Sequence, residues 1–522
     1  MNLLTDQWIP VRPLDGGGTG KISLRDLLCG ERRWELCLPR DDMELAAMQL
    51  LICITQVIMT PKTTEELRSR IAKPLSKGDY EIEIQPYGDW FHLDHHEYPF
   101  MQVRGVTAKD QTPMDKLLPG VTGATNSCFV NQPGLADGLC PGCTAIALFN
   151  QASCAPSFGG GFKPGLRGFA TPVTTLVQGD HLRRTIWLNV LNKEAITQNL
   201  PWHGDTGTQK PTWMEPIKAS EAIPIQRIGF LRGLLWQPDH IELFPPITAE
   251  SCSCCGIQTD KAYTAFNKAQ FRYTITGTWP HPHSPRIMTS KKGQMKEKFV
   301  AFTTSAPAWT QLSRFIVQQQ MDETNIEGQQ PASVILQARI LYGTNSQKLH
   351  LLVGGYRNNQ ASVLERHHEV FTLNHGWDQH SDVIKELVSK GMGYRSALTG
   401  ALFFFCKGLK DKKAKTVKLK GLGEKIELVK VAETQFYRRS EPTVEETLAR
   451  IDFTMPELEL VRMRKVLKGI VEELFEESVR PYLNDPELIR TLAVARKTLY
   501  KHLNNLEPQK GKGGDDGATE TP

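Results

Sequence analysis

From about residue 381 onward, apolar residues recur at the spacing of amphipathic helices. Four such stretches follow one another, at about 381–406, 431–451, 455–483 and 486–505. The third stretch carries one apolar seam at alternating steps of three and four, made of Leu460, Met463, Leu467, Ile470 and Leu474. Each helix must cover its apolar side, and the short connections at 452–454 and 484–485 make neighbours antiparallel. The pattern predicts a four-helix bundle over 376–506.

Local signals indicate where two of these helices begin. Thr454 and Glu457 have the spacing of a capping box ahead of the third helix. Asp485 is placed to cap the fourth helix, with Pro486 in its first turn. The seam of the fourth helix is Leu488, Leu492, Ala495 and Leu499. Residues 507–522 are Gly-rich and polar, so we expect a disordered tail.

The first 375 residues mix short β-type runs with helical stretches and contain many glycines and prolines. A helix begins at Asp41 or Asp42, whose carboxylate we expect to cap it, with Glu44 completing the cap of Asp41. Apolar residues on all its faces predict that it is buried. Strands are predicted at 184–191, 271–278 and 348–353. These elements predict an α+β protein with a mixed α/β domain over 1–375.

Composition narrows the class of protein. The 522 residues are 40% hydrophobic and 23% charged, which excludes a disordered or collagen-like chain. No apolar run reaches the roughly 20 residues of a membrane span, and the first eight residues have no basic stretch leading into an apolar core. The eleven cysteines are scattered and odd in number, which indicates reduced thiols. We therefore expect a cytoplasmic protein without a membrane partner.

The positive charge of the chain is concentrated in one segment. Between Lys407 and Lys430, nine lysines stand against three acidic residues, so this segment carries +6 and the rest of the chain, whose total is +5, about −1. We expect the segment to join the first two helices of the bundle. A lysine-rich loop either contacts a polyanion or is a solvated connector, and composition leaves both readings open.

Two CxxC pairs have the spacing of metal ligands: Cys140 with Cys143, and Cys252 with Cys255. Two thiolates at this spacing can reach one Zn²⁺ ion, and two such pairs complete a tetrahedral structural site. The pairs lie more than a hundred residues apart, so a metal would pin two distant parts of the chain together. We favour structural zinc, with Cys254 as a possible substitute ligand; the alternative is buried or incidental cysteines.

Two glycine-containing segments could lie close to a bulky ligand. Gly159, Gly160 and Gly161 are adjacent and leave backbone amides free of side chains, although the run lacks the order of a nucleotide phosphate loop. Asn359 and Gln360 follow a second glycine pair and an apolar run, and amide side chains can both donate to and accept from base edges. The alternatives are a flexible turn for the first segment and a hydrogen-bonded turn for the second.

The histidines give little support for an enzyme. His95 and His96 are adjacent, as are His367 and His368, so the members of each pair point apart on a helix or a strand. The segment Trp279–His283 holds two more imidazoles, but no HExxH, Asp-rich or GxSxG partner accompanies any of them. We interpret the chain as non-enzymatic. The competing hypothesis is a metal-dependent nuclease or phosphoesterase that uses these histidines.

Long, unusual strings in the sequence resemble the CasA family, the large subunits of the type I-E CRISPR surveillance complex Cascade. The strings are Asn2–Pro13, Leu38–Ala47, Gly123–Asn126, Phe129–Gly134, Trp279–Pro285, Ala301–Pro307, Gly354–Ser362 and Thr498–Leu503. The resemblance implies a large mixed α/β domain of unusual topology followed by a four-helix bundle. It also implies a role in antiviral defence. The large domain would recognise the protospacer-adjacent motif (PAM) of double-stranded DNA mainly from the minor groove and start strand separation.

By position, the resemblance assigns roles to several residues. Gly159–Gly161 would press backbone onto the minor groove, while Asn359 and Gln360 would form a wedge, with Gln360 displacing a base pair. The segment that docks beside the 5′ handle of the guide RNA would include Phe129, Val130 and Asn131. The four CxxC cysteines match a zinc-type cluster of the family. The implied partners are other Cascade subunits, guide RNA, double-stranded target DNA and a recruited helicase-nuclease.

The chain departs from the family pattern at the groove-reading lysine. That lysine aligns with Gln270, whereas Lys268 lies two residues earlier; on a strand the two would share a face, and either could reach the groove. Lys291 and Lys292 resemble a basic pair that could guide the displaced strand, with a solvated turn as the alternative. The lysine-rich segment is more basic than in relatives, so a DNA role for it rests on charge.

Overall fold

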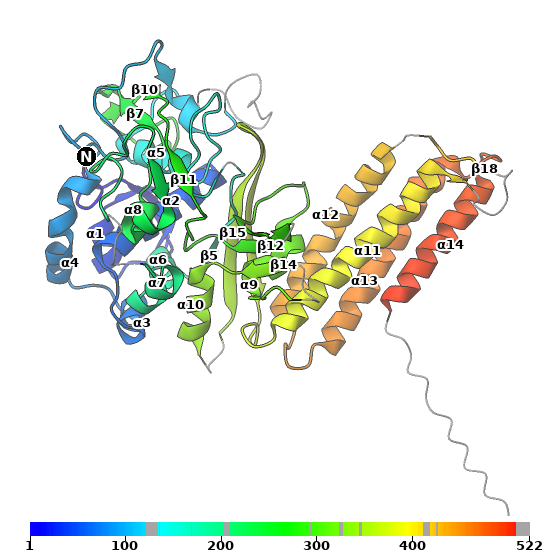
Figure 1. Ribbon diagram of the computed structural model, residues 1–522. Helices are drawn as coiled ribbons and strands as arrows, with labels where there is room; N and C mark the ends of the chain where they lie inside the picture. The colour runs from blue at the N-terminus through cyan, green and yellow to red at the C-terminus, as the bar shows by residue number, and fades with distance from the viewer. Residues whose placement is uncertain are drawn as a thin grey trace, which may run out of the picture. The chain divides into compact units, whose positions relative to one another are not determined.

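The computed structural model describes residues 1–121, 134, 136–168, 170–202, 209–291, 294–322, 327–343, 347–410, 418–423 and 426–507. The chain forms two compact units, shown in Figure 1. The first unit comprises Met1–Ala308 and Arg314–Asp378, and the second comprises Trp309–Ser313 and the chain from Gln379 onward. The first mixes helices with short strands and the second is mainly helical, which confirms the predicted α+β class. Within the described residues, every helix is too short or too polar to cross a membrane.

Four long helices make up the second unit. They are α11 (Ser381–Lys407), α12 (Ile426–Arg450), α13 (Glu457–Val479) and α14 (Ile489–Leu506). Helix α11 contacts the other three, and α12 also contacts α13. The seam of α14 is buried as predicted, and that of α13 is buried except that Val471 takes the place of the half-buried Ile470. Apolar periodicity thus correctly located the packed faces of these helices.

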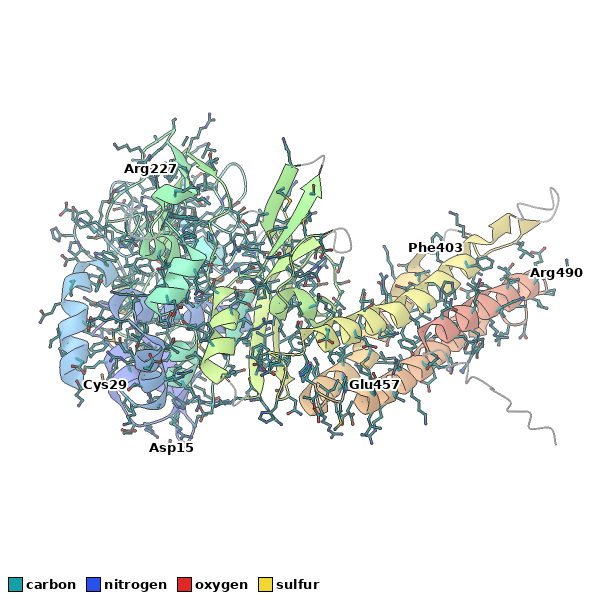
Figure 2. The ribbon with its side chains drawn as sticks, turned by 60° about the horizontal axis from the view of Figure 1, so that its bottom comes forward. Asp15, Cys29, Arg227, Phe403, Glu457 and Arg490 are labelled. Carbon is teal, nitrogen blue, oxygen red and sulfur yellow. The ribbon has the colours of Figure 1, made fainter. Side chains whose placement is uncertain are left out.

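The predicted starts of α13 and α14 are wrong by two and three residues. Helix α13 begins at Glu457 (Figure 2), because the backbone N–H and hydroxyl of Thr454 donate to Asp452 Oδ1 instead of forming a capping box. Asp485 accepts from the N–H of Glu487 at 3.0 Å and caps a turn that precedes α14. In both places a nearby carboxylate stabilises a turn outside the helix.

The lysine-rich segment contains a short β-ladder. Strands β17 (Leu409–Lys410) and β18 (Lys418–Leu419) pair antiparallel, while 411–417 and 424–425 lie outside the described residues. Thr491 of α14 donates its hydroxyl to the carbonyl of Lys420 at 2.6 Å. Lys420 also forms an ion pair with Glu487. The end of this segment is therefore attached to α14, which a purely flexible connector would not be.

Small sheets support the first unit. The three-stranded sheets are β2-β1-β3 (Gly20–Ile22, Ile9–Pro13, Trp34–Leu36), β4-β10-β7 (Thr112–Pro113, Ala265–Ala269, His240–Leu243), β13-β12-β14 (Gln294–Phe299, Arg286–Lys291, Glu327–Gln330) and β16-β15-β5 (Ser362–Leu373, Leu349–Asn359, Thr174–Val177). Two-stranded sheets pair β11 (Thr274–Thr276) with β6 (Ala222–Pro224) and β8 (Ile247–Thr248) with β9 (Lys261–Ala262). The strand predicted at 348–353 is confirmed within β15, whereas of 271–278 the three residues of β11 form a strand.

The helices of the first unit surround one central helix, α2. In chain order they are α1 (Leu24–Cys29), α2 (Asp41–Ile58), α3 (Thr64–Ala72), α4 (Lys77–Ile84), α5 (Pro141–Ser153), α6 (Leu182–Leu188), α7 (Lys193–Asn199), α8 (Phe230–Leu234) and α10 (Ser333–Tyr342). Helix α9 (Leu312–Ile316) begins within the segment of the second unit. Helix α2 contacts α5, α6, α8, β15 and β16 and is buried on all sides, as its sequence predicted.

Two local predictions for this unit are wrong. Residues 184–191 fold largely as helix α6 and not as a strand, because His181 caps the helix by accepting from the N–H of Arg184 and the segment is buried all round. Helix α2 does start at Asp41, but its N-cap is Arg40, which makes no side-chain cap. The two carboxylates still accept from first-turn amides, Asp41 Oδ1 from the N–H of Asp42 and Asp42 Oδ1 from the N–H of Met43, both at 3.0 Å. Asp42 also pairs with Arg40 at 2.6 Å.

Strands β15 and β16 form a long hairpin that is tied to the helical core near its tip. The hydroxyl of Tyr356, a β15 residue that is 2% exposed, donates to Asp42 Oδ2 at 2.9 Å and accepts from Asn150 Nδ2 at 2.8 Å. Asp42 lies in the first turn of α2 and Asn150 lies on α5, so one hydroxyl links three elements. Gly354 allows β15 to approach α2, since a Cβ there would lie 2.6 Å from Leu45 Cδ2.

We expect Tyr356→Phe to lower the free energy of unfolding by about 1–3 kcal/mol, because buried groups of Asp42 and Asn150 would lose a hydrogen-bond partner. Chemical denaturation monitored by fluorescence would measure the change. Tyr500→Phe is the matched control, because Tyr500 is 45% exposed. Equal stability of the two variants would contradict this account of how Tyr356 anchors the hairpin.

Candidate functional site

The three adjacent glycines form a loop directly after helix α5. Gly159, Gly160 and Gly161 have φ values of +77°, +58° and +100°, a left-handed region that side chains other than glycine rarely adopt. The N–H of Phe162 donates to the Gly159 carbonyl at 3.1 Å and closes the turn. The next N–H, of Lys163, donates to Asp239 Oδ1 at 3.0 Å. We call this segment the glycine loop (Gly159–Gly161). It requires glycine because three consecutive residues have a left-handed backbone conformation.

One face of strand β10 lies against the glycine loop. Phe266 and Lys268 alternate on this strand, and Gln270 follows at its end, so all three point to the same side. The ring of Phe266 lies 6.0 Å from that of Phe158, centroid to centroid, and Gln270 Nε2 donates to the carbonyl of Gly160 at 2.5 Å. The structure thus brings both Lys268 and Gln270 to the loop, as a shared strand face predicted.

The tip of the β15–β16 hairpin lies beside the same loop. Asn359 pairs with Ser362, which leaves a two-residue turn of Gln360 and Ala361. Gln360 has a φ of +54° and is exposed, as is Asn359. A Cβ at Gly159 would lie 3.0 Å from the Cβ of Ala361. The two glycine-containing segments singled out in the sequence are therefore neighbours in space, about 200 residues apart along the chain.

A cavity of about 660 Å³ opens where these parts meet, and we call it the loop–hairpin cavity. Its wall includes Lys109, Lys116, Phe158, Phe162, Lys268 and Ala361. Three of these side chains are lysines, and Asp110 is the one acidic residue that lines the cavity among the described residues. The cavity therefore presents positive charge next to backbone that carries no side chains, which suits a polyanion.

Sequence reasoning missed the two phenylalanines and Lys116. Phe158 and Phe162 flank the glycine loop, with ring centroids 5.4 Å apart at an interplanar angle of 74°. Lys268 Nζ lies 5.4 Å from the Phe158 ring centre and 4.5 Å from that of Phe162. The symmetric placement of aromatic residues around three glycines was a signal available in the sequence. Nothing in the sequence near Lys116 placed it against Lys268.

His367 of β16 packs the hairpin against Phe302 and lies between two carboxylates of its own strand. It stacks on Phe302 with ring centres 4.0 Å apart, and its Nδ1 lies 3.1 Å from Glu369 Oε1. Glu365 Oε2 lies 3.6 Å from the other ring nitrogen. Burial alone would lower the pKa of this imidazole, but the two carboxylates raise the pKa of His367 to about 9. The side chain is therefore a buried cation in a structural role at neutral pH.

The raised pKa of His367 predicts pH-dependent stability. Its folded pKa of about 9 lies above the ordinary value near 6.5, so its contribution is complete below pH 6.5 and is lost as the pH rises through 9. We expect the free energy of unfolding to fall by up to about 3 kcal/mol more in the wild type than in His367→Gln between pH 6 and pH 9.5. Urea denaturation at both pH values measures this.

The exposed His350 on β15 provides the matched control, as His350→Gln. That variant should follow the wild-type pH dependence. A wild-type curve parallel to that of His367→Gln across this range would show that His367 is not held protonated by its two carboxylates.

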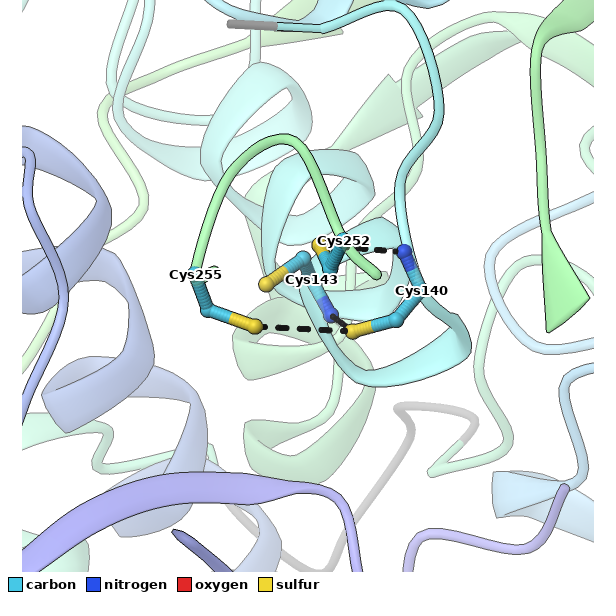
Figure 3. Close-up of side chains that lie close together, drawn as sticks. All are labelled: Cys140, Cys143, Cys252 and Cys255. Atoms are coloured by element: carbon cyan, nitrogen blue, oxygen red, sulfur yellow. Dashed lines mark hydrogen bonds between the residues drawn. The ribbon is translucent and has the colours of Figure 1, made fainter. Parts of the chain in front are cut away.

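The four CxxC cysteines converge at the start of α5 (Figure 3). Their sulfur atoms all lie within 4.8 Å of one another, and Cys140 Sγ is 4.0 Å from Cys255 Sγ. Four thiolates around one Zn²⁺ at about 2.3 Å are separated by about 3.8 Å, so the arrangement is compatible with structural zinc. Cys140 is the N-cap of α5, and the N–H groups of Cys140 and Cys143 donate to cluster sulfurs. Cys252, Cys140 and Cys143 are buried, and Cys255 is half-buried.

The four thiols of this cluster differ in pKa: those of Cys140 and Cys252 are lowered, and those of Cys143 and Cys255 are raised. Hydrogen bonds within the cluster, first of all with Cys143, lower the pKa of Cys140 to about 7, and contacts with three cluster thiols lower that of Cys252. The bond with Cys140 is the main cause that raises the pKa of Cys143 and of Cys255. Close thiols of this kind release their remaining protons when a cation binds.

The other predicted site residues lie apart from these two sites or outside the described residues. Phe129, Val130, Asn131 and Lys292 fall outside them, and Lys291 ends strand β12. Cys254 is buried but is not among the four converging sulfurs.

The histidines that the structure describes do not assemble into a metal site. Among the described residues, the cysteine cluster is the one group of three or more His, Cys, Asp or Glu side chains whose ligand atoms converge. His95 Nδ1 accepts from the N–H of Tyr98 at 2.9 Å, and His283 Nδ1 lies 3.1 Å from Gln49 Nε2 in the core. These contacts favour structural roles for both histidines.

The sequence matches a known protein family and a characterised relative. The family model of CRISPR-associated protein Cse1 matches residues 2–474. A CasA/Cse1 protein of Thermus thermophilus is 25% identical over 205 residues, an alignment that spans 36% of this chain and 39% of the length of that relative.

Solved structures share the fold over almost the whole chain. Thermus thermophilus CasA (Cse1) superposes with a TM-score of 0.70 at 19% identity, covering 97% of this chain and 99% of the other. A chain of a CRISPR RNA-guided surveillance complex superposes with a TM-score of 0.62 at 14% identity, covering 96% of this chain and 99% of the other. These likenesses confirm the fold class that the sequence predicted.

Proposed function

The chain belongs to the CRISPR-associated protein Cse1 family, and we propose that it is the large, non-catalytic subunit of an RNA-guided surveillance complex that recognises the PAM in double-stranded DNA. The observation that carries this proposal is the meeting of the glycine loop, the β10 face and the hairpin tip beside one lysine-lined cavity, whose wall includes Phe158 and Phe162 on either side of the loop. Three segments that are distant in sequence converge there. Each carries residues suited to contact DNA.

The glycine loop is suited to the minor groove. That groove is about 6 Å wide, so backbone without side chains enters it more readily than a helix or a bulky residue does. The groove distinguishes mainly A·T from G·C pairs, so readout there is degenerate and accepts several related motifs. Lys268 or Gln270 beside the loop would add a contact to the groove or its edges.

Gln360 is suited to act as a wedge, with Asn359 beside it. It is exposed at the end of a two-residue turn, and the hairpin that carries it is anchored at Tyr356 and His367. Displacing a base pair costs a few kcal/mol, and a rigid support is needed if contact energy is to be used for that step. Pairing of the guide RNA with the exposed strand would then offset the cost.

Other parts of the chain are assigned to partners. The segment with Phe129, Val130 and Asn131 would dock beside the guide RNA, next to other subunits of the complex. Lys291, which ends β12, and Lys292, which follows it in the sequence, would guide the displaced strand. A surface of the same subunit would recruit the helicase-nuclease, which supplies the cleavage. A complex that searches DNA in this way would work in the cytoplasm.

The PAM role predicts separate effects on binding and on strand opening. In complexes assembled with Gln360→Ala, we expect duplex opening beside the PAM, measured with 2-aminopurine fluorescence, to fall on the order of tenfold, or about 1.4 kcal/mol. Binding of a randomised PAM library should retain its sequence preference, because the glycine loop is intact.

The control is Gln318→Ala, which removes an exposed glutamine that does not line the loop–hairpin cavity. If the wild-type complex bound all library members equally, the proposed function would be wrong. Normal opening in Gln360→Ala would instead remove the wedge from the proposal.

We also propose that the cysteine cluster binds one structural zinc ion. The four thiols would be its ligands, and the ion would join the start of α5 to the turn at 252–255. Its chemistry there is to hold four thiolates together in a closed site, without an open position for catalysis. The convergence of four sulfurs from two distant segments supports this assignment.

Zinc binding predicts a measurable metal content. Purified protein should carry about one zinc per chain by mass spectrometry of metals, and Cys255→Ser should lose most of it. Its melting temperature should fall by roughly 5 °C or more, because metal binding contributes to folding. Cys37→Ser, which removes a half-buried cysteine outside the cluster, should keep both properties. Equal metal content in all three proteins would exclude this site.

A further inference from the structure

Lys268 and Gln270 reach the same loop from the same strand face, yet their side chains are engaged differently. The inference about which of the two contacts DNA rests on the proposed function. The contacts of each side chain in the free protein separate their roles.

Gln270 is engaged with the loop itself. Its Nε2 donates to the carbonyl of Gly160, the middle glycine, at 2.5 Å. A Cβ at Gly161 would lie 3.2 Å from Gln270 Oε1, so the amide also packs against the next residue. Glycines lose more conformational freedom on folding than other residues, and a bond to the middle carbonyl limits the conformations that the loop samples.

Lys268 is engaged with aromatic rings, and its ammonium forms no direct ion pair with a carboxylate of the described residues. Its ammonium lies over Phe162 and Phe158, the two rings on either side of the glycine loop. Among the described residues, no carboxylate oxygen lies within 4.0 Å of this ammonium. Cation–π contact fixes the position of a lysine while it stays charged and keeps donors available.

A second lysine makes the cavity favourable for an anionic ligand. Lys116 lines the same cavity as Lys268. Burial and, next, the repulsion from Lys116 lower the pKa of Lys268, and attraction to Asp239 offsets part of this effect. A ligand that brings negative charge between two such amines relieves their repulsion, and a DNA strand carries one phosphate per nucleotide.

We infer that Lys268 is the cation that this chain places against DNA beside the PAM, and that Gln270 is a positioning residue that holds the glycine loop in shape. Phe158 and Phe162 form the support for Lys268. This assignment of roles explains how a neutral residue at position 270 is compatible with DNA binding. The positive charge comes from Lys268, two residues earlier on the same face of the strand.

Two nearly isosteric variants test the division of roles in assembled complexes. Lys268→Met should weaken binding to PAM-bearing duplex on the order of tenfold and reduce the slope of log affinity against log salt concentration by about one, and Lys268→Arg should restore both. Gln270→Met should weaken binding roughly two- to tenfold with the salt slope unchanged. In the full chain, Gln270→Met should also speed hydrogen exchange at the amide of Phe162, which closes the glycine turn.

Lys261→Met is the matched control, because Lys261 is an exposed lysine of β9 that does not line this cavity. It should leave affinity, salt slope and loop exchange unchanged. An unchanged salt slope in Lys268→Met would overturn its role as the DNA-contacting cation. Weakened binding by Gln270→Met without faster exchange would show that Gln270 contacts DNA directly.

These outcomes are distinct from a failure of the proposed function. If the wild-type complex does not distinguish PAM-bearing from PAM-free duplex, the function itself is wrong. If the wild type discriminates and Lys268→Met matches it in affinity and salt slope, PAM recognition stands and the assignment of Lys268 falls.

Discussion

The placement of the β15–β16 hairpin depends on one buried ion pair, between Arg40 and Asp42. Their side chains are 4% and 3% exposed, and Arg40 Nη2 lies 2.6 Å from Asp42 Oδ2. A buried pair is tolerated when its remaining donors and acceptors are also satisfied. Here the Tyr356 hydroxyl donates to Asp42, and Arg40 donates to the carbonyl of Pro119 at 2.9 Å. Satisfying these charges therefore fixes β15 against the start of α2 and the chain at Pro119.

The precision of the site follows from that core. Gln360, the proposed wedge, lies four positions beyond Tyr356, directly after the paired strand β15, so the segment between anchor and tip is short and stiff. The glycine loop begins six residues after α5 ends and is held by β10. The proposed DNA-contacting surface, made of a turn and a loop, thus takes its geometry from regular elements, which is how loops acquire defined functional shapes.

The sequence predicted individual helices and candidate site segments better than the tertiary contacts between them. Apolar periodicity located the bundle faces at Leu467 and Leu492, because burial of a helix stripe leaves a repeating pattern. Helix starts were predicted less well, since Asp452 and Asp485 stabilise preceding turns, a competition that spacing alone does not decide. The segment at 184–191 misled because β-branched and aromatic residues also fill short helices that are buried all round.

The candidate site shows the same limit. The residue types of the glycine loop, the amide pair and the cysteine pairs could be recognised, because glycine, amide and thiol chemistry is local. Their proximity could not, because it arises from tertiary packing. The contact between Gly159 and Ala361, and the position of Lys268 over two phenylalanine rings, depend on how α5, β10 and the hairpin pack together.

The cysteine cluster lies at the start of α5, and the glycine loop follows the end of this helix. Because Gln270 contacts Gly160, the two segments that leave the cluster meet again at the glycine loop and form a closed loop of chain. One path runs from Cys143 along α5, a helix of about 20 Å, to Gly160. The other runs from Cys255 through β9 and β10 to Gln270, whose amide meets Gly160 again. A ring closed at both ends resists bending more than two free arms would. The cluster can therefore stiffen the glycine loop, the proposed DNA reader, without touching it.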